Sequence, residues 1–169
     1  MKNMKSREEL IVNEIKNNPG IRFREVMEKV KLTNGVLSYY IRKLENLQVI
    51  KTQRTPRVSR FYLFDMNEEE SKIVKRLRQT TPKAIIVSLL ENENIEFKQI
   101  VSNVEKSSAT VSFYLSKLVN DDIVNYKRIE LKKVYFVKEK SRIANLITEY
   151  HPDVIENASD NLADIMSSL

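Results

Sequence analysis

The stretch that decides the fold is residues 33–51, TNGVLSYYIRKLENLQVIK. Its apolar residues recur at intervals of three and four, which is the spacing of a buried stripe along a helix. Thr33 stands where an N-cap residue belongs, and after the stripe the helical period gives way to a β-capable run. The stretch therefore predicts an amphipathic helix that leads into a strand. The residues expected to face the core are Leu37, Tyr40, Ile41, Leu44 and Leu47.

A second copy of this stretch lies 74 positions further along the chain. When residues 95–128 are aligned with residues 21–54 without a gap, nine of the 34 pairs are identical. Unrelated sequences of ordinary composition would give about two. The simplest explanation is two copies of one small domain. The identical pairs are Ile21/Ile95, Phe23/Phe97, Val30/Val104, Ser38/Ser112, Tyr40/Tyr114, Lys43/Lys117, Leu44/Leu118, Asn46/Asn120 and Arg54/Arg128.

The same elements are expected around both copies. In the first copy, one helix precedes the repeated block and a short helix lies inside it. Two β-capable runs separated by a turn at Pro56 follow the helix expected over 33–47, called here the decisive helix. Three helices and a hairpin in this order form the winged helix-turn-helix plan. The expected helices are 7–17, 21–30 and 33–47 in the first copy and 81–92, 97–104 and 107–122 in the second, with hairpins over 49–64 and 123–137.

The predicted fold class is mainly α with small β-hairpin wings: two tandem winged helix-turn-helix domains plus C-terminal helices. Asn67, followed by three glutamates, indicates the start of a linker helix between the domains. The predicted parts are a first winged-helix domain at 1–65, a linker helix at 66–80, a second winged-helix domain at 81–138 and a C-terminal helical dimerisation or packing segment at 139–169.

Both copies of the decisive helix resemble the archaeal and bacterial winged-helix regulators related to the ArsR and MarR families. The pattern is a small residue, a β-branched pair, a serine, an aromatic residue and then a leucine-bracketed Arg-Lys. It is carried by TNGVLSYYIRKLENLQVIK and, with Ser in place of Arg, by SSATVSFYLSKLVNDDIV. The resemblance implies two winged helix-turn-helix domains and a role in DNA-binding transcriptional regulation.

The exposed side of the first decisive helix carries residue types that contact DNA. A helix fits the major groove, where short polar side chains approach base edges and Arg or Lys reach bases or phosphates. Cations on the hairpin would grip the backbone or the minor groove, with Arg57 at the tip. A plainer reading makes Lys51 and Arg54 edge-strand charges that discourage aggregation. The candidate DNA-binding residues are Thr33, Asn34, Ser38, Tyr39, Arg42 and Lys43 on the helix, and Lys51, Arg54, Arg57 and Arg60 on the hairpin.

The second copy is expected to bind DNA more weakly. Ser116 replaces Arg42, Ser108 replaces Asn34, and two aspartates follow the helix, although the hairpin stays basic. This copy would contact an adjacent groove or serve as a packing partner, and linking two weak sites makes the second contact intramolecular. Its candidate DNA-binding residues are Ser108, Thr110, Ser112, Lys117, Lys127, Arg128, Lys132 and Lys133.

The net charge of +6 is unevenly distributed along the chain. Residues 1–64 carry 14 Lys and Arg against 6 Asp and Glu, a net +8, whereas residues 139–169 carry a net −4. The basic first segment favours a polyanion as partner. No cysteine, one histidine and two glycines argue against thiol chemistry, metal sites and glycine-rich phosphate loops. We therefore expect no cofactor, no metal and no enzyme activity.

The tail after residue 139 has a different pattern. Apolar residues from Ile155 to Leu169 recur at intervals of three and four. This seam either folds back on the second domain or pairs with a second chain, and dimerisation is the preferred reading. His151 is expected in a surface turn. The apolar runs are too short to span a membrane and the chain starts without a signal-peptide core, so a cytoplasmic protein is expected. The candidate dimerisation residues are Ile155, Leu162, Ile165 and Leu169.

Together these features predict a sequence-specific double-stranded DNA-binding transcriptional regulator that acts at promoters. Its expected partners are duplex DNA, a second copy of the chain and the basal transcription machinery. Three alternatives remain open: a tandem winged-helix interaction scaffold resembling ScpB proteins, a basal transcription factor resembling the TFE family, and a non-specific chromatin protein. The concentration of positive charge in the first domain argues against the first alternative, and the lack of zinc-binding cysteines argues against the second.

Overall fold

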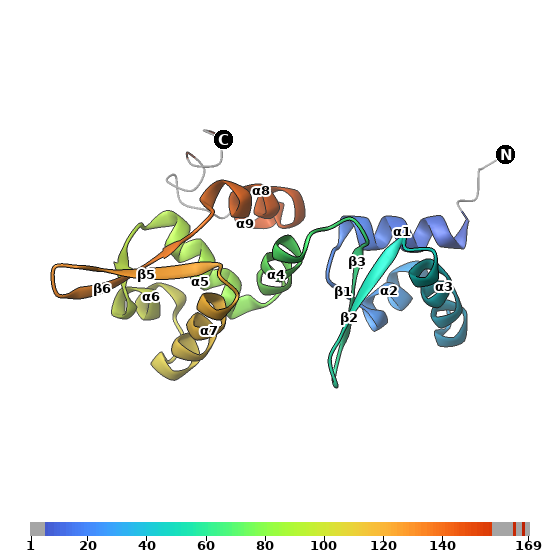
Figure 1. Cartoon of the computed structure of the whole chain (residues 1–169), viewed down its shortest axis with the longest axis horizontal. Helices are drawn as coiled ribbons and strands as arrows, with labels where there is room; N and C mark the ends of the chain where they lie inside the picture. The colour runs from blue at the N-terminus through green and yellow to red at the C-terminus, as the bar shows by residue number, and fades with distance from the viewer. Residues whose placement is uncertain (1–5, 157–163, 165–166, 168–169) are drawn as a thin grey trace. The chain divides into compact units, whose positions relative to one another are not determined.

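A computed structural model describes residues 6–156, 164 and 167 of the 169-residue chain. The fold is mostly helical with two small antiparallel sheets, which confirms the predicted fold class. The chain divides into two compact units, Met1–Ser71 and Lys72–Leu169, and each has its own hydrophobic core (Figure 1).

The first unit combines three helices with an antiparallel sheet of strand order β1-β3-β2. The side chain of Ser6 accepts a hydrogen bond from the backbone N–H of Glu9, and the Glu9 carboxylate accepts one from the N–H of Ser6. This capping box satisfies donors that a helix start leaves without partners. The elements are α1 (Arg7–Asn17), β1 (Ile21–Arg22), α2 (Phe23–Val30), α3 (Asn34–Asn46), β2 (Ile50–Arg54) and β3 (Ser59–Leu63).

The first core lies where the helices meet the sheet. Ile11 and Ile15 of α1 and Leu37 and Leu44 of α3 are all buried, because each pair is spaced to share one helix face. Burying each such side chain stabilises the fold by roughly 1.5–3 kcal/mol. The expectation that Leu47 also faces the core is wrong: it is 60% exposed, since it follows the last turn of α3 as the C-cap.

The second unit repeats this plan and adds helices at both ends. Its sheet is antiparallel with strand order β4-β6-β5. The side chain of Ser107 caps α7 by accepting a hydrogen bond from the N–H of Thr110 at 3.2 Å. Besides the last turns of α4 (Glu68–Leu77), the unit contains α5 (Thr80–Glu91), β4 (Ile95–Glu96), α6 (Phe97–Val104), α7 (Ser108–Asn120), β5 (Val124–Ile129), β6 (Lys132–Val137), α8 (Lys140–Tyr150) and α9 (Pro152–Glu156).

The offset of 74 residues holds in backbone detail as well as in sequence. α2, α3, β1 and the start of β2 coincide with α6, α7, β4 and the start of β5 after this shift. Left-handed residues recur at the same offset, although such backbone is uncommon outside glycine. The matched left-handed pairs, with their φ angles, are Gly20 (76°) and Asn94 (56°), Lys31 (53°) and Glu105 (54°), and Gln48 (55°) and Asp122 (63°).

Two short strands were missed by sequence reasoning. β1 and β4 are two residues long, so they show no alternation of apolar and polar residues that could reveal a strand. Each adds a third strand to its hairpin, with Ile21 opposite Phe61 and Ile95 opposite Tyr135. The helix expected over 21–30 consequently begins only at Phe23.

Helix α4 lies within the range predicted for the linker helix, and its apolar edge packs into the second core. Ile73, Val74 and Leu77 are buried there, and Arg76, only 8% exposed, donates a hydrogen bond to Asp121 at 2.5 Å. Asn67 accepts a hydrogen bond from the N–H of Glu70, as expected of a cap. The boundary between the two compact units falls within this helix, after residue 71.

One residue of the predicted dimerisation seam, Ile155, lies in the described part of the tail. Ile155 of α9 packs against the core of its own unit, because the break at His151 lets α9 turn back beside α8. Leu162, Ile165 and Leu169 lie outside the described residues. His151 is half-buried rather than on the surface. Among the helices that the structure describes, none is long and apolar enough to cross a membrane.

Candidate nucleic-acid interface

One face of α3 is covered by the first core and the other is open to solvent. Asn34, Arg42 and Asn46 are exposed, and the ring of Tyr39 is 63% exposed. A Cβ added at Gly35 would meet no atom within 4 Å, so the leading turn is open to an approaching partner. The residues that line the hollow along this face are Gly35, Ser38, Tyr39, Arg42, Lys43, Asn46 and Leu47.

Local contacts hold the polar side chains of this face in place. The hydroxyl of Ser38 donates a hydrogen bond to the side-chain oxygen of Asn34 at 3.2 Å, and Tyr39 packs edge-on against Tyr40 with 5.2 Å between ring centroids. Arg42 has no ion-pair partner among the residues that the structure describes. Its guanidinium is therefore available to an external acceptor. Thr33 occupies the N-cap position, but its side chain makes no capping hydrogen bond.

Lys43 is tied to another helix of the same unit. Its ammonium group lies 2.5 Å from a carboxylate oxygen of Glu8 in α1. This hydrogen bond and the attraction between the two charges raise the pKa of Lys43 above its ordinary value. Lys43 therefore remains charged, and a phosphate would have to compete with Glu8 for it.

The four hairpin cations expected to contact DNA fall into different environments. Arg57 is exposed at the tip. Arg54 is exposed too, but its guanidinium lies 2.8 and 3.0 Å from the two carboxylate oxygens of Glu45, which ties β2 to α3. Lys51 is half-buried and donates a hydrogen bond to the carbonyl of Met66.

The fourth cation, Arg60, requires a correction. It is only 9% exposed, and its guanidinium donates a hydrogen bond to the carbonyl oxygen of Gly20 at 2.9 Å. Arg60 lies in β3, the middle strand of the sheet, and its guanidinium is directed to the segment just before β1 rather than to solvent. The strand β1 was not predicted from the sequence, and the burial of Arg60 was therefore not predicted either.

Two arginines near the first hairpin were missed by sequence reasoning. Arg22 and Arg24 are exposed at the start of α2 and line the same hollow as Arg57. Glu25 and Glu28 border it as well. Because this grouping depends on pairing between β1 and β3, the only signal in the sequence was the local density of arginine after residue 21. A helix start beside three arginines suits a phosphate.

The exposed face of α7 offers shorter side chains than that of α3. The hydroxyl of Ser116 donates a hydrogen bond to the carbonyl of Ser112, and the hydroxyls of Thr110 and Ser107 bond to each other at 2.8 Å. The ammonium of Lys117 lies 4.3 Å from the ring centroid of Phe113, which is 55% exposed. Ser108 and Ser112 are exposed. The hydroxyls of Ser116 and Thr110 are therefore already hydrogen-bonded within the unit.

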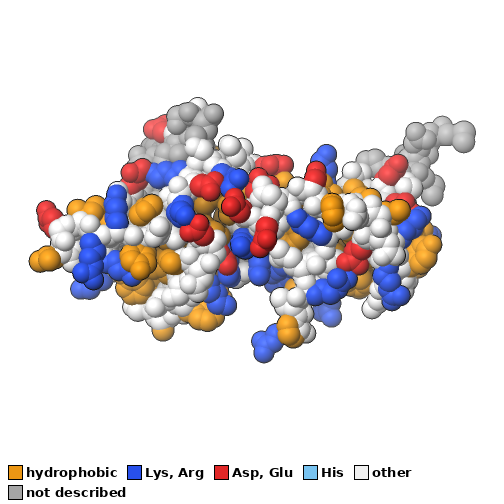
Figure 2. Space-filling model, viewed as in Figure 1, with side chains coloured by type: hydrophobic (Ala, Val, Ile, Leu, Met, Phe, Trp, Pro, Cys, Tyr) orange, Lys and Arg blue, Asp and Glu red, His pale blue; other side chains and the backbone are white. Residues whose placement is uncertain are grey.

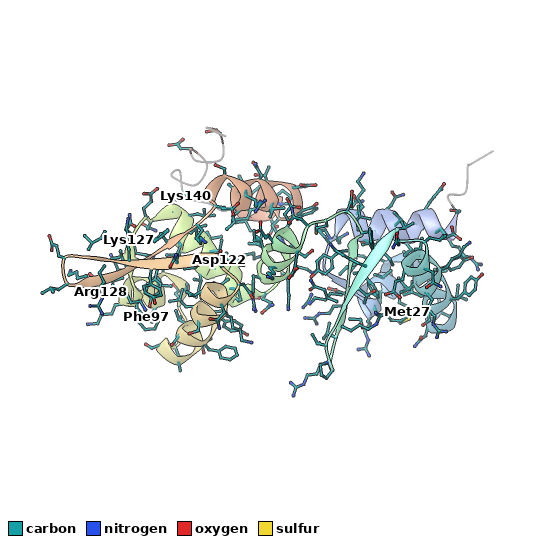
Figure 3. The ribbon with its side chains drawn as sticks, in the orientation of Figure 1. Met27, Phe97, Asp122, Lys127, Arg128 and Lys140 are labelled. Atoms are coloured by element: carbon teal, nitrogen blue, oxygen red, sulfur yellow. The ribbon has the colours of Figure 1, made fainter. Side chains whose placement is uncertain are left out.

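The hairpin of the second unit concentrates cations instead. Lys127, Arg128, Lys132 and Lys133 are all exposed, and Figure 3 shows Lys127 and Arg128 on β5. Lys132 pairs with Glu96 at 2.9 Å, and this hydrogen bond and the charge attraction raise the pKa of Lys132 above its ordinary value. The two aspartates after α7 are neutralised within the unit, since Asp121 bonds to Arg76 and Asp122 bonds to Lys138 at 2.6 Å.

Two family models match the chain, one on each repeated copy. A model described as winged helix-turn-helix DNA-binding matches residues 4–51, and one described as bacterial regulatory protein, arsR family, matches residues 82–126. The chain therefore contains two helix-turn-helix domains in tandem. α3 and α7 are the third helices of the two copies, and the prediction of two winged helix-turn-helix domains in tandem is confirmed. The predicted resemblance to the ArsR family is matched on the second copy.

A relative of this chain occurs in Methanocaldococcus jannaschii and is described as an uncharacterized HTH-type transcriptional regulator. The two chains are 28% identical over 129 residues, which is 76% of this chain and 32% of the relative. The chain therefore spans about a third of the length of that relative. The family matches and this relative support a DNA-binding regulator as the general class of function.

Proposed function

We propose that the protein is a sequence-specific regulator that binds double-stranded DNA at promoters, with α3 in the major groove. The observation that carries this proposal is the exposed face of α3. There Tyr39 and Arg42 lie opposite the buried stripe of Leu37 and Leu44, and Asn34 is exposed at the first residue of the helix, so all three can reach a partner without disturbing the core. Asn and Arg are the side chains that pair bidentately with adenine and guanine edges.

The first hairpin would contact the sugar-phosphate backbone beside the major groove. Arg57 at its tip shares a hollow with Arg22 and Arg24, and these three cations are exposed. Cations of this kind position a protein on DNA without reading its sequence. The net charge of +8 over residues 1–64 supports the assignment, because a polyanion is attracted to that segment.

A protein-interaction role is the second candidate function. It is favoured by Tyr39 of α3 and Leu47 at its C-cap, which are 63% and 60% exposed and line the same hollow. Exposed aromatic and aliphatic side chains near an arginine also anchor protein interfaces.

Selection from a pool of random duplexes, with sequencing of the bound fraction, separates the two candidates. We expect an enriched motif for the wild-type chain, and loss of the motif in the Tyr39→Ala, Arg42→Ala double variant with its fold intact, as circular dichroism would show. Removing one bidentate pairing with a base costs about 1–3 kcal/mol of discrimination. Ser116→Ala in α7 is the matched control and should keep the motif. Absence of any duplex binding by the wild type would favour the interaction role, and an unchanged motif in the double variant would contradict the proposed helix.

A further inference from the structure

The end of the second hairpin is exposed over eight consecutive residues, 126–133. In the first hairpin the corresponding exposed run covers only residues 54–57. β5 and β6 are six residues long, and a two-residue loop, Glu130–Leu131, joins them, so the hairpin projects from the helices of its unit (Figure 1). This projecting end is free to reach a partner.

Two cations on the projecting end lie where their repulsion lowers the stability of the free protein. Arg128 and Lys133 stand directly opposite each other in the strand register. Like charges in that position destabilise a sheet. The ammonium of Lys133 stacks 3.7 Å from the ring centroid of Tyr126, and neither cation has an ion-pair partner in the described part of the chain. A bound polyanion would relieve this repulsion.

Apolar side chains lie among these cations. Leu131, in the loop, is 99% exposed, Ile129 is 45% exposed and Tyr126 is 48% exposed. Two-residue hairpin loops favour Asn-Gly or similar pairs, so neither the turn nor the core accounts for a leucine there. Figure 2 shows hydrophobic side chains next to Lys and Arg over this end of the hairpin.

We propose that the second hairpin, which is the wing of the second unit, enters the minor groove of DNA and inserts Leu131 as an apolar wedge that bends the duplex. The inference rests on the proposed function, because it assumes that the partner is DNA. Proteins that bend DNA commonly insert an apolar side chain between base steps while cations hold the flanking phosphates. Lys127, Arg128 and Lys133 supply those cations, and their charge selects a polyanion as the occupant of the tip. The carboxylate of Glu130 beside Leu131 opposes binding and limits its strength.

The bend can be measured by energy transfer between dyes at the two ends of a duplex taken from the bound fraction of the random pool. The wild type should bring the dyes together. Leu131→Ala should reduce the bend and weaken binding about tenfold, as expected when a leucine side chain is no longer buried against the bases. Leu131→Met, which keeps an apolar wedge, should retain the bend. Leu10→Ala, at a partly exposed leucine of α1, is the control outside both wings and should have no effect. The fold should survive Leu131→Ala because this side chain is almost fully exposed.

Four results would overturn the inference. A wild type that binds a straight duplex, or a Leu131→Ala variant that bends DNA as well as the wild type, would remove the wedge and leave the proposed function intact. Leu131→Ala that releases the chain from vesicles of anionic lipid but leaves DNA binding unchanged would assign the tip to a membrane surface. A wild type that binds no duplex at all would overturn the proposed function itself. This result differs from failure of the wedge alone because no variant would then bind DNA.

Discussion

The two winged-helix units share one backbone plan but place their cations differently. The first has Arg42 on the exposed face of α3, where the second has Ser116 on α7. The second has four exposed cations along residues 127–133 of its hairpin, whereas the first keeps Arg60 buried and Lys51 half-buried. The buried positions of the two units match, whereas their exposed positions differ in where the cations lie.

The attachment of each wing to its helix differs as well. In the first unit the guanidinium of Arg54 lies 2.8 Å from the carboxylate of Glu45, which holds the hairpin against α3. At the offset of 74 residues the second unit has Arg128 and Val119, which cannot form this pair. Val119 instead lines a hollow between α7 and the second hairpin. Of this matched pair of arginines, Arg54 is held within its unit, whereas Arg128 has no ion-pair partner among the described residues.

The largest effect should come from the cores. Leu37 is fully buried in α3, and Leu37→Ala should lower the free energy of unfolding of the first unit by about 2–5 kcal/mol. Because the cores are separate, the second unit should unfold as before. Val111→Ala, the change at the matched position of α7, should destabilise the second unit and leave the unfolding of the first unchanged. Differential scanning calorimetry would resolve the two transitions. A single transition that shifts in both variants would show that the units do not unfold separately.

A smaller effect should follow when the second helix is made more like the first. Ser116→Arg places a guanidinium where α3 has Arg42. We expect affinity for duplex DNA to rise roughly fivefold, as one added interaction worth about 1 kcal/mol would give. Fluorescence anisotropy with a labelled duplex measures this. Ser116→Gln, which adds length without charge, is the control, and equal affinity of the Arg and Gln variants would mean that α7 does not approach DNA.

The smallest effect should be a pH dependence confined to the second unit, which contains the only histidine of the chain. Burial lowers the pKa of His151, Lys83 and Arg78 lower it further, and Asp153 opposes them. The folded state therefore resists protonation, and the unfolded state binds the proton first as pH falls below about 6.5. Stability should be highest above that pH and should decline below it until the folded histidine is also protonated.

Chemical unfolding of the second unit at several pH values would measure this dependence. His151→Asn should flatten the decline, whereas the first unit, which lacks histidine, should show no such step near this pH. A decline that persists unchanged in His151→Asn would show that His151 is not the source of the pH dependence.

The sequence was sufficient for the helices and the hairpins because their patterns are local. The stripe of Leu37, Ile41 and Leu44 predicted the buried face of α3, and the repeat predicted a second copy of it in α7. The strands β1 and β4 escaped because two residues carry no period, and their existence depends on pairing with β3 and β6.

The same non-local pairing explains the errors in the candidate site. From the sequence alone, Arg60 is expected to be an exposed cation on a strand, because the pairing of β1 with β3 is not visible there. Arg22 and Arg24 are likewise expected to be ordinary charges at a helix start, because only the folded structure brings them near the first hairpin. Leu131 also escaped, because a leucine in a sequence gives no sign of whether it is buried or exposed. Helix faces follow from spacing, whereas exposure on a wing depends on what packs around it.

The division of work between α3 and the second wing is tested most directly by one binding experiment. Wild type, Arg42→Ala and a Lys127→Ala, Arg128→Ala double variant would be compared for enriched motif and for the slope of log affinity against log salt concentration. We predict that Arg42→Ala loses the motif and changes the slope little. The double variant should keep the motif with a slope shallower by roughly two units, since each phosphate contact contributes about 0.9. Loss of the motif in the wing variant, with the motif intact in Arg42→Ala, would contradict this division.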